Sequence, residues 1–244
     1  MSSTTIQATS PATEETLEHT CSRGDFFGLL ALMLDFHNLY DVFEGLASGL
    51  LVKDILAIGH ELDIDDPRLY TPCSKLESLK KEASANKGSY TALRQEYTRL
   101  FNNPSASEIA FYEGAFVNRR SKKRGKEAPD HDLLFINQAA CDADRQYRRA
   151  GVKRAENMNI PGDCMLTEMA YMQYLQQLKA QALRDGNLKQ LAEIDAWLAE
   201  FTRLHLKVWM KDFFEACNTL STHVYFQALG LLGQILAQEV LEES

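Results

Sequence analysis

Long apolar runs are missing from this chain of 244 residues. The longest run, Phe26 to Leu34, is interrupted by Gly28, and it is about half of the roughly 18 apolar residues that a membrane-spanning helix needs. The first residues, Met1 to Thr16, are rich in Ser and Thr and lack the basic start and apolar stretch of an export signal. We therefore expect a cytoplasmic protein that is not inserted in a membrane, with a flexible N-terminus over residues 1–20.

Closely spaced cysteines are missing as well. The five cysteines are an odd number and are never closer than 23 residues to one another. This spacing excludes a local CxxC redox pair and a zinc knuckle, both of which need ligands a few residues apart. We expect free thiols in a reducing compartment, where unpaired cysteines behave as small apolar side chains.

Basic residues are fewer than acidic ones, 26 against 34, which gives a net charge of −8. An acidic protein repels nucleic-acid phosphates and attracts cationic partners, so we expect no nucleic-acid binding. The basic residues are unevenly spread, and the stretch from Val117 to Asp132 is charged and lacks an apolar period. This pattern predicts a long exposed loop. Six basic residues cluster in it: Arg119, Arg120, Lys122, Lys123, Arg124 and Lys126.

Sustained two-residue alternation, the mark of a half-buried strand, is not found. Apolar residues instead recur at steps of three and four, as Met165, Met169 and Met172 illustrate, which is typical of amphipathic helices. The sequence predicts an all-α protein, a helical bundle of about nine helices. Breaks are expected at Asp65–Pro67, Thr71–Pro72, Asn102–Ser105, Asn159–Asp163 (with Asp163 as a candidate N-cap) and Asp185–Asn187.

The domain organisation follows from the same helix breaks and from the charged stretch. We expect a single all-helical domain over residues 21–244 after the flexible N-terminus. Within it, an N-terminal part (21–116) and a C-terminal part (133–244) are joined by the basic loop (117–132), and contacts between the two parts make them one domain. The oligomeric state is left open, and a homodimer is compatible with the sequence.

Local catalytic signatures are missing too. His60-Glu61 begins like a metalloprotease HExxH motif but has no second histidine, so the two-imidazole zinc face cannot form. The chain has no phosphate-binding GxxxxGK[ST] loop, and Gly45 to Gly49 is not a GxSxG nucleophile elbow. We predict no catalytic residues, no metal site, no cofactor and no enzymatic activity. A site assembled from distant residues remains the alternative.

Five short motifs occur in a fixed order. Tyr97, Leu100 and Phe101 are followed by Pro104 in a loop and then by Tyr112-Glu113. The remaining motifs are Tyr147-Arg148-Arg149-Ala150-Gly151, then Asp163 with Glu168, Tyr171 and Met172, and finally His205-Leu206 with Trp209 and Phe213.

Taken together, these motifs resemble the TorD/DmsD/NarJ-like family of redox-enzyme maturation chaperones. The resemblance covers about Tyr90 to Leu236, and Cys164 stands where that family has a histidine, which it replaces only as a weak donor. It implies a TorD-like fold and a chaperone that binds the apo-molybdoenzyme catalytic subunit or its twin-arginine signal peptide. It also implies peptide binding by nine residues: Tyr97, Phe101, Tyr112, Glu113, Asp163, Cys164, Glu168, Tyr171 and Met172.

Each of these assignments has a structural alternative. The stripe Met165, Met169 and Met172 lines a peptide groove in the functional interpretation and belongs to the core in the other, which its period favours. The aromatic residues are more typical of packing. A second function is also open: a helical ligand-sensing or adaptor protein that encloses a small molecule in an apolar cavity.

Overall fold

The computed structural model describes residues 11–64, 66–85, 87–103, 107–123, 125, 137–152 and 161–242. The helices are α1 (Pro11–Leu34), α2 (Leu39–Ser48), α3 (Leu50–Glu61), α4 (Asp66–Ala85), α5 (Lys87–Tyr97), α6 (Glu113–Lys123), α7 (Gln138–Arg149), α8 (Met165–Arg184), α9 (Leu188–Phe201), α10 (Lys207–Leu220) and α11 (Val224–Glu242). Three short turns accompany them: the 3₁₀ turn η1 (Phe36–Asn38) and the π-helical turns η2 (Thr98–Asn102) and η3 (Thr202–Leu206).

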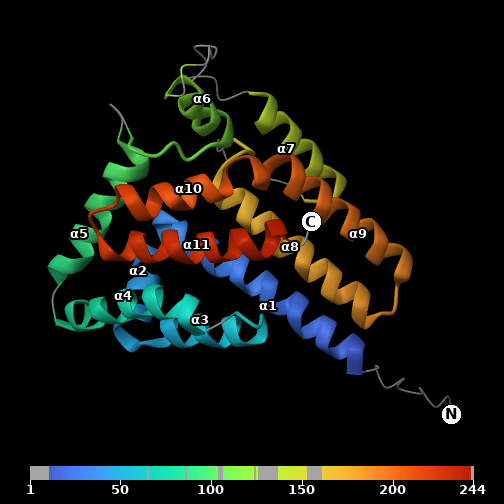
Figure 1. The fold of residues 1–244 in the computed structure, drawn as a ribbon, viewed down its shortest axis with the longest axis horizontal. Helices are drawn as coiled ribbons and strands as arrows, with labels where there is room; N and C mark the ends of the chain where they lie inside the picture. Colours follow the sequence, from blue (N-terminus) through green and yellow to red (C-terminus); the bar gives the residue numbers. More distant parts are fainter. Residues whose placement is uncertain are drawn as a thin grey trace.

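The predicted all-α helical bundle is confirmed, although these helices outnumber the nine or so expected (Figure 1). Among the described residues, the only β-type pairing is an isolated bridge between Tyr112 and Cys164. All five cysteines are free thiols, as predicted.

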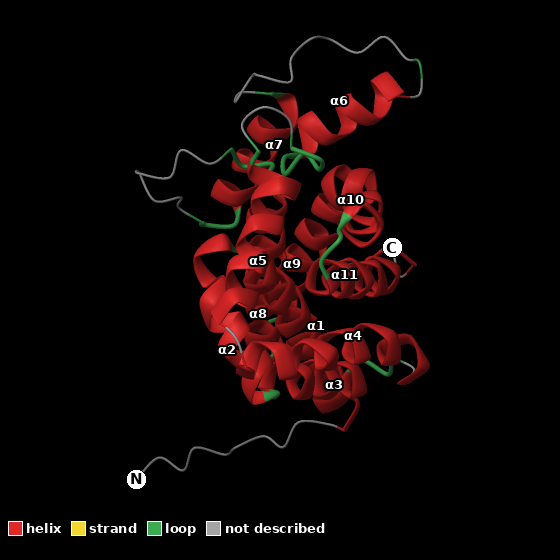
Figure 2. Cartoon of the chain, turned by 90° about the vertical axis from the view of Figure 1, so that its left-hand side faces the viewer, coloured by secondary structure: helices red, strands yellow, loops and turns green. Residues whose placement is uncertain are grey.

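Helices that are far apart in sequence pack side by side. The first helix, α1, runs along α8, and α4 lies against α11, which also packs on α10 (Figure 1). Figure 2 shows α6 and α7 at one end of the molecule and α3 and α4 at the other. One apolar cluster runs through the described residues and takes side chains from both the N-terminal and the C-terminal parts of the chain.

Helices α1 and α8 bury their apolar faces in the core of the protein. Phe27 and Leu30 of α1 and Met165 and Met169 of α8 have no exposed surface. Burying each such side chain contributes roughly 1.5–3 kcal/mol. The methionine stripe of α8 therefore belongs to the core, as its period favoured.

A glycine sets the distance between α10 and α11. A Cβ atom built on Gly230 would lie 2.4 Å from the backbone nitrogen of Asn218 and 2.6 Å from the carbonyl oxygen of Phe214. Real side chains do not approach backbone atoms so closely. Only glycine at this position lets the two helices pack as they do.

Two segments that were expected to be flexible are helical in the structure. Residues 11–20, assigned to a flexible N-terminus, form the first turns of α1, because Pro11 is well suited to a first helical position and the acidic Glu14 favours an N-terminal turn. Residues 117–123, assigned to the basic loop, are the second half of α6. Lysines such as Lys122 have good helix propensity and suit the negative end of the helix dipole, so charge alone did not indicate a loop. Residues 1–10 and most of 124–136 lie outside the described residues.

The expected breaks are found in part. Helix α3 ends at Glu61, and residues 185–187 form the turn between α8 and α9, where Gly186 has a φ of 63°. The break expected at Thr71–Pro72 is wrong: Pro72 lies inside α4, whose apolar residues Leu69 and Leu76 are buried on either side of it. Pro104 lies outside the described residues.

In the described part of the chain, no single helix is long and apolar enough to cross a membrane. The segments Thr16–Leu34 and Phe36–Ser48 reach that length and composition only as a pair, which is bent by 81°.

Candidate functional site

Eight of the nine residues predicted to bind a peptide are buried, and Tyr112 is half-buried. The structure does not bring them together on one surface. They fall into an aromatic cluster, a junction between two helix starts and a buried polar cluster, while Tyr171 reaches a surface pocket and Met172 is in the core. Their contact with a peptide stays a prediction.

The aromatic cluster contains Tyr97 and Phe101. Their ring centroids are 5.0 Å apart, and Phe101 also packs on Phe111 at 5.1 Å and on Phe226 at 5.9 Å. Helix α5 continues into the π-helical turn η2, which carries Phe101 into this cluster. Phe101 also stacks on Phe213 of α10. Such aromatic packing joins α5, α10 and α11, so these residues act as core side chains.

The helix-start junction is held by Asp163. The predicted N-cap role at α8 is wrong, because Cys164 occupies that position and makes no side-chain capping bond. The Asp163 carboxylate instead accepts hydrogen bonds from the backbone N–H of Gly114 at 3.0 Å and from Asn137 Nδ2 at 2.9 Å. A carboxylate beside the first turn of α6 is stabilised by the helix dipole. Asp163 therefore anchors the start of α6.

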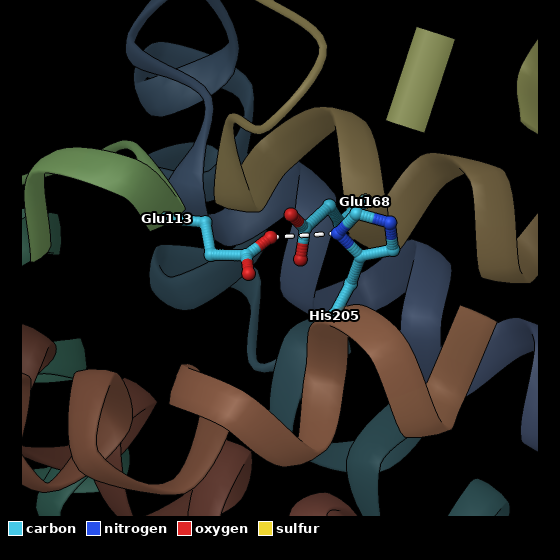
Figure 3. Close-up of side chains that lie close together, drawn as sticks. All are labelled: Glu113, Glu168 and His205. Carbon is cyan, nitrogen blue, oxygen red and sulfur yellow. Dashed lines mark hydrogen bonds and ion pairs between the residues drawn. The ribbon is translucent and has the colours of Figure 1, made fainter. Parts of the chain in front are cut away.

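Glu113 and Glu168 meet His205 inside the protein (Figure 3). The three side chains come from α6, α8 and the π-helical turn η3, and they point toward one another. His205 Nδ1 lies 2.7 Å from Glu113 Oε2, and Trp209 Nε1 donates a 2.9 Å hydrogen bond to Glu168 Oε2. Burial, followed by the nearby charge of Glu113, raises the pKa of Glu168 well above its ordinary value.

A further carboxylate supports His205 from its other side. Asp142 Oδ2 lies 3.1 Å from His205 Nε2 and accepts a 2.8 Å hydrogen bond from Gln146 Nε2. Arg145 also pairs with Asp142. Sequence reasoning gave His205 only as a match to a later family helix and missed Asp142. No local signal exists for this cluster, because its residues come from four separate segments of the chain.

A separate apolar pocket opens between the end of α7 and α8, with a volume of about 260 Å³. Three tyrosines shape it, and each directs its hydroxyl to a backbone carbonyl, as Tyr171 does to Gln146 and Tyr174 to Ala150, both at 3.2 Å. Their rings are thus fixed while their apolar surfaces line the hollow. The lining residues are Tyr147, Gly151, Val152, Thr167, Ala170, Tyr171 and Tyr174.

The pocket exists because small residues lie between the tyrosines. On α8, Thr167, Ala170, Tyr171 and Tyr174 share one face, which is distinct from the face of the methionine stripe. Ala170 is exposed, so the pocket opens at the surface. These residues of α8 form one wall of the pocket and the end of α7 forms the other. Of the lining residues, only Tyr171 was among the predicted site residues.

Charged side chains lie beside the pocket. Arg149 pairs with Glu200 at 2.5 Å, and its guanidinium lies 5.9 Å from the centre of the Trp197 ring. Burial raises the pKa of Tyr171 to about 12, while the charges of Arg149 and Glu200 act on it in opposite directions. The pocket therefore combines an apolar floor with charged neighbours of both signs.

One comparison with known proteins identifies the family. The family model described as nitrate reductase delta subunit matches residues 66–215, more than half of the chain, and this range contains the pocket and the buried polar cluster. A search of curated proteins found no match to the chain. The resemblance predicted from the motifs is thereby confirmed. The chain belongs to the nitrate reductase delta subunit family, a NarJ/TorD-like family of chaperones for molybdoenzyme maturation.

Proposed function

We propose that this protein binds the twin-arginine signal peptide or the N-terminal segment of a molybdopterin-containing oxidoreductase. By holding that segment in the cytoplasm it delays export and assists cofactor insertion into the apo-enzyme, and it performs no covalent chemistry itself. The single observation that carries this proposal is the apolar pocket at the end of α7, which lies within the segment that matches the family.

The chemistry of the partner fits this pocket. A signal peptide has a basic start followed by an apolar segment, and such segments bind in grooves through a few apolar anchor residues. A volume of about 260 Å³ accommodates an apolar side chain of the partner rather than a whole cofactor. The net charge of −8 attracts the basic start of the segment.

The alternative of a ligand sensor requires an enclosed cavity. Two residues that line this pocket, Gly151 and Ala170, are exposed. An open pocket supports binding of a polypeptide that continues beyond it. The supporting surface is thus the outer face of α8, while the methionine stripe on its inner face stabilises the fold.

Calorimetric titration tests the proposal. The ligands are the synthetic signal peptide and the apo-form of a molybdoenzyme encoded beside this protein. Ala170→Arg places a long charged side chain at the mouth of the pocket, and we expect it to weaken binding at least tenfold. Ala192→Arg is the matched control, because Ala192 is also exposed, on α9, and does not line the pocket.

Two results contradict the proposal. The first is that folded protein binds neither the peptide nor the apo-enzyme. The second is that Ala170→Arg and Ala192→Arg bind equally tightly, which would move the site away from the pocket. Charge reversal at Asp163 or Glu168 is a poor test, because both are fully buried and the variants would lose stability for other reasons.

A further inference from the structure

We propose that Glu113, Glu168 and His205 bind one divalent first-row transition-metal ion where α6, α8 and η3 meet. Each residue offers one ligand atom, and the three atoms lie within 4.8 Å of one another. All three side chains are buried, with exposed fractions of 5%, 0% and 2%. The site is independent of the apolar pocket and of the proposed peptide binding.

The spacing suits a small cation. With metal–ligand bonds of about 2.1 Å, two ligands of one ion lie no more than about 4.2 Å apart. Ligands of one tetrahedral ion at this bond length lie about 3.4 Å apart. Ligand atoms that are separated by up to 4.8 Å therefore approach one another by up to about 1.4 Å when the ion binds. The three side chains point toward one another (Figure 3), so the ligand atoms face a common position between α6, α8 and η3.

An unsatisfied oxygen points independently to a ligand. Glu168 Oε1 is completely buried and has no hydrogen-bond partner among the described residues, while Oε2 of the same carboxyl accepts from Trp209. A buried polar atom without a partner costs about 1–3 kcal/mol, and native proteins rarely leave one without a reason. A cation held between Glu168 and His205 supplies the missing partner.

The surrounding residues form the support that metal ligands need. A metal-binding histidine almost always donates its other ring N–H to a carboxylate or carbonyl, and Asp142 is placed for this role, 3.1 Å from His205 Nε2. Nδ1 is then left facing the two glutamates. Trp209 fixes Glu168 in the same way.

The ligand set defines the class of ion. Two carboxylates and one imidazole suit manganese, iron, cobalt or zinc in the divalent state, and the absence of sulfur among the three ligands disfavours Cu(I). The two carboxylates balance the charge of the ion, and each ligand releases any proton that it carries to solvent when the ion binds. Because the ligands are buried, the ion is enclosed as the chain folds.

The test uses the full chain, unfolded in denaturant with a chelator and refolded with Co²⁺, Zn²⁺ or Mn²⁺ or without metal. After gel filtration we expect about one equivalent of bound metal, a visible Co²⁺ absorption typical of nitrogen and oxygen ligands, and a rise in Tm of several degrees. Folded wild-type protein that retains less than about a tenth of an equivalent of each ion overturns the proposal.

Variants locate the ion. Glu168→Gln keeps the shape and an acceptor for Trp209 but removes the ligand charge, and it should reduce metal affinity at least tenfold. The control replaces the exposed pair His60 and Glu61 by Gln, since these side chains lie 3.8 Å apart at the surface. Loss of the metal in this control, or full retention in folded Glu168→Gln, shows a surface-bound ion and overturns the proposal. If Glu168→Gln does not fold, the wild-type refolding result decides alone.

Discussion

At the scale of single residues, Glu96 is a buried carboxylate that stabilises the fold because several donors hydrogen-bond to it. Its Oε1 accepts hydrogen bonds from Ser221 Oγ at 2.8 Å and from the backbone N–H of Thr222 at 2.6 Å, and Arg99 Nε donates to its Oε2 at 2.8 Å. Burial acts to raise the pKa of Glu96, but these donors outweigh it and lower the pKa to about 2. The carboxylate thus fixes the loop before α11 to the end of α5.

This pKa predicts a pH-dependent stability. The folded pKa of Glu96 is about 2 and the ordinary value is 4.5, so its contribution is full above pH 4.5 and is lost as the pH falls toward 2. We expect Glu96→Gln to lower the free energy of unfolding by on the order of 2–3 kcal/mol at pH 7. Chemical denaturation of the variant and the wild type at a series of pH values should show this gap shrinking below pH 4.5.

Glu108 provides the matched control. It also pairs with Arg99, at 3.6 Å, but its side chain is 51% exposed. Exposed ion pairs contribute little, so Glu108→Gln should change the free energy of unfolding by less than about 0.5 kcal/mol at every pH. Equal losses in the two variants, or a Glu96→Gln loss that does not depend on pH, would contradict the assignment.

Residue burial was only partly predictable from the sequence. Glu168 was expected to meet a basic peptide, yet it lies three residues after Met165 and four before Met172, which places it on the inward face of α8. The helical period therefore held the information that Glu168 is buried. That His205 lies near Glu168 could not have been found from the sequence, because their proximity depends on how α8 and η3 pack.

At the scale of elements, the crossing of α10 and α11 depends on Gly230. We expect Gly230→Ala to lower the free energy of unfolding by about 1–3 kcal/mol, because the new methyl group meets backbone atoms that cannot yield without moving a helix. Thermal denaturation followed by circular dichroism measures the change.

Gly45→Ala is the control, and we expect it not to lower the free energy of unfolding. Gly45 is also inside a helix, α2, but among the described residues a Cβ atom there meets only Leu51 Cβ, at an ordinary 3.9 Å. Alanine is the better helix former by roughly 0.5–1 kcal/mol, so this variant should be at least as stable as the wild type. A stable Gly230→Ala variant would show that the two helices can separate without cost.

The sequence predicted that the elements are helices more reliably than it predicted where each helix begins and ends. Apolar residues at steps of three and four gave helices throughout, and the turn at 185–187 was indicated by its Asp-Gly-Asn run. The start of α1 and the basic half of α6 were missed because neither has an apolar period. Arg120 of α6 pairs with Asp212 of α10, a tertiary contact that local patterns do not reveal.

At the scale of the whole molecule, the packing of distant segments predicts cooperative unfolding. Helix α1 packs on α8 and α4 on α11, so the two parts of the described chain share one apolar core. Differential scanning calorimetry should therefore give one transition, with equal calorimetric and van't Hoff enthalpies. Two transitions, one for residues 21–116 and one for 133–244, would show that the expected single domain is two.

The bundle was predictable at this scale, whereas the pocket was not. Helical period and composition sufficed for an all-α domain, and the order of five motifs indicated the family. The pocket required the end of α7 to lie beside the outer face of α8, so that Tyr147 and Tyr174 line the same hollow. That placement results from tertiary packing.

The pairing of α1 with α8 also has a consequence during synthesis. Helix α1 is synthesised more than a hundred residues before α8, on which it packs. Helix α4 is likewise synthesised long before α11. Until α8 emerges, the face of α1 that packs against it is exposed, and exposed apolar surface promotes aggregation of nascent chains. A member of a chaperone family thus depends, while it is being made, on protection of its own first helix.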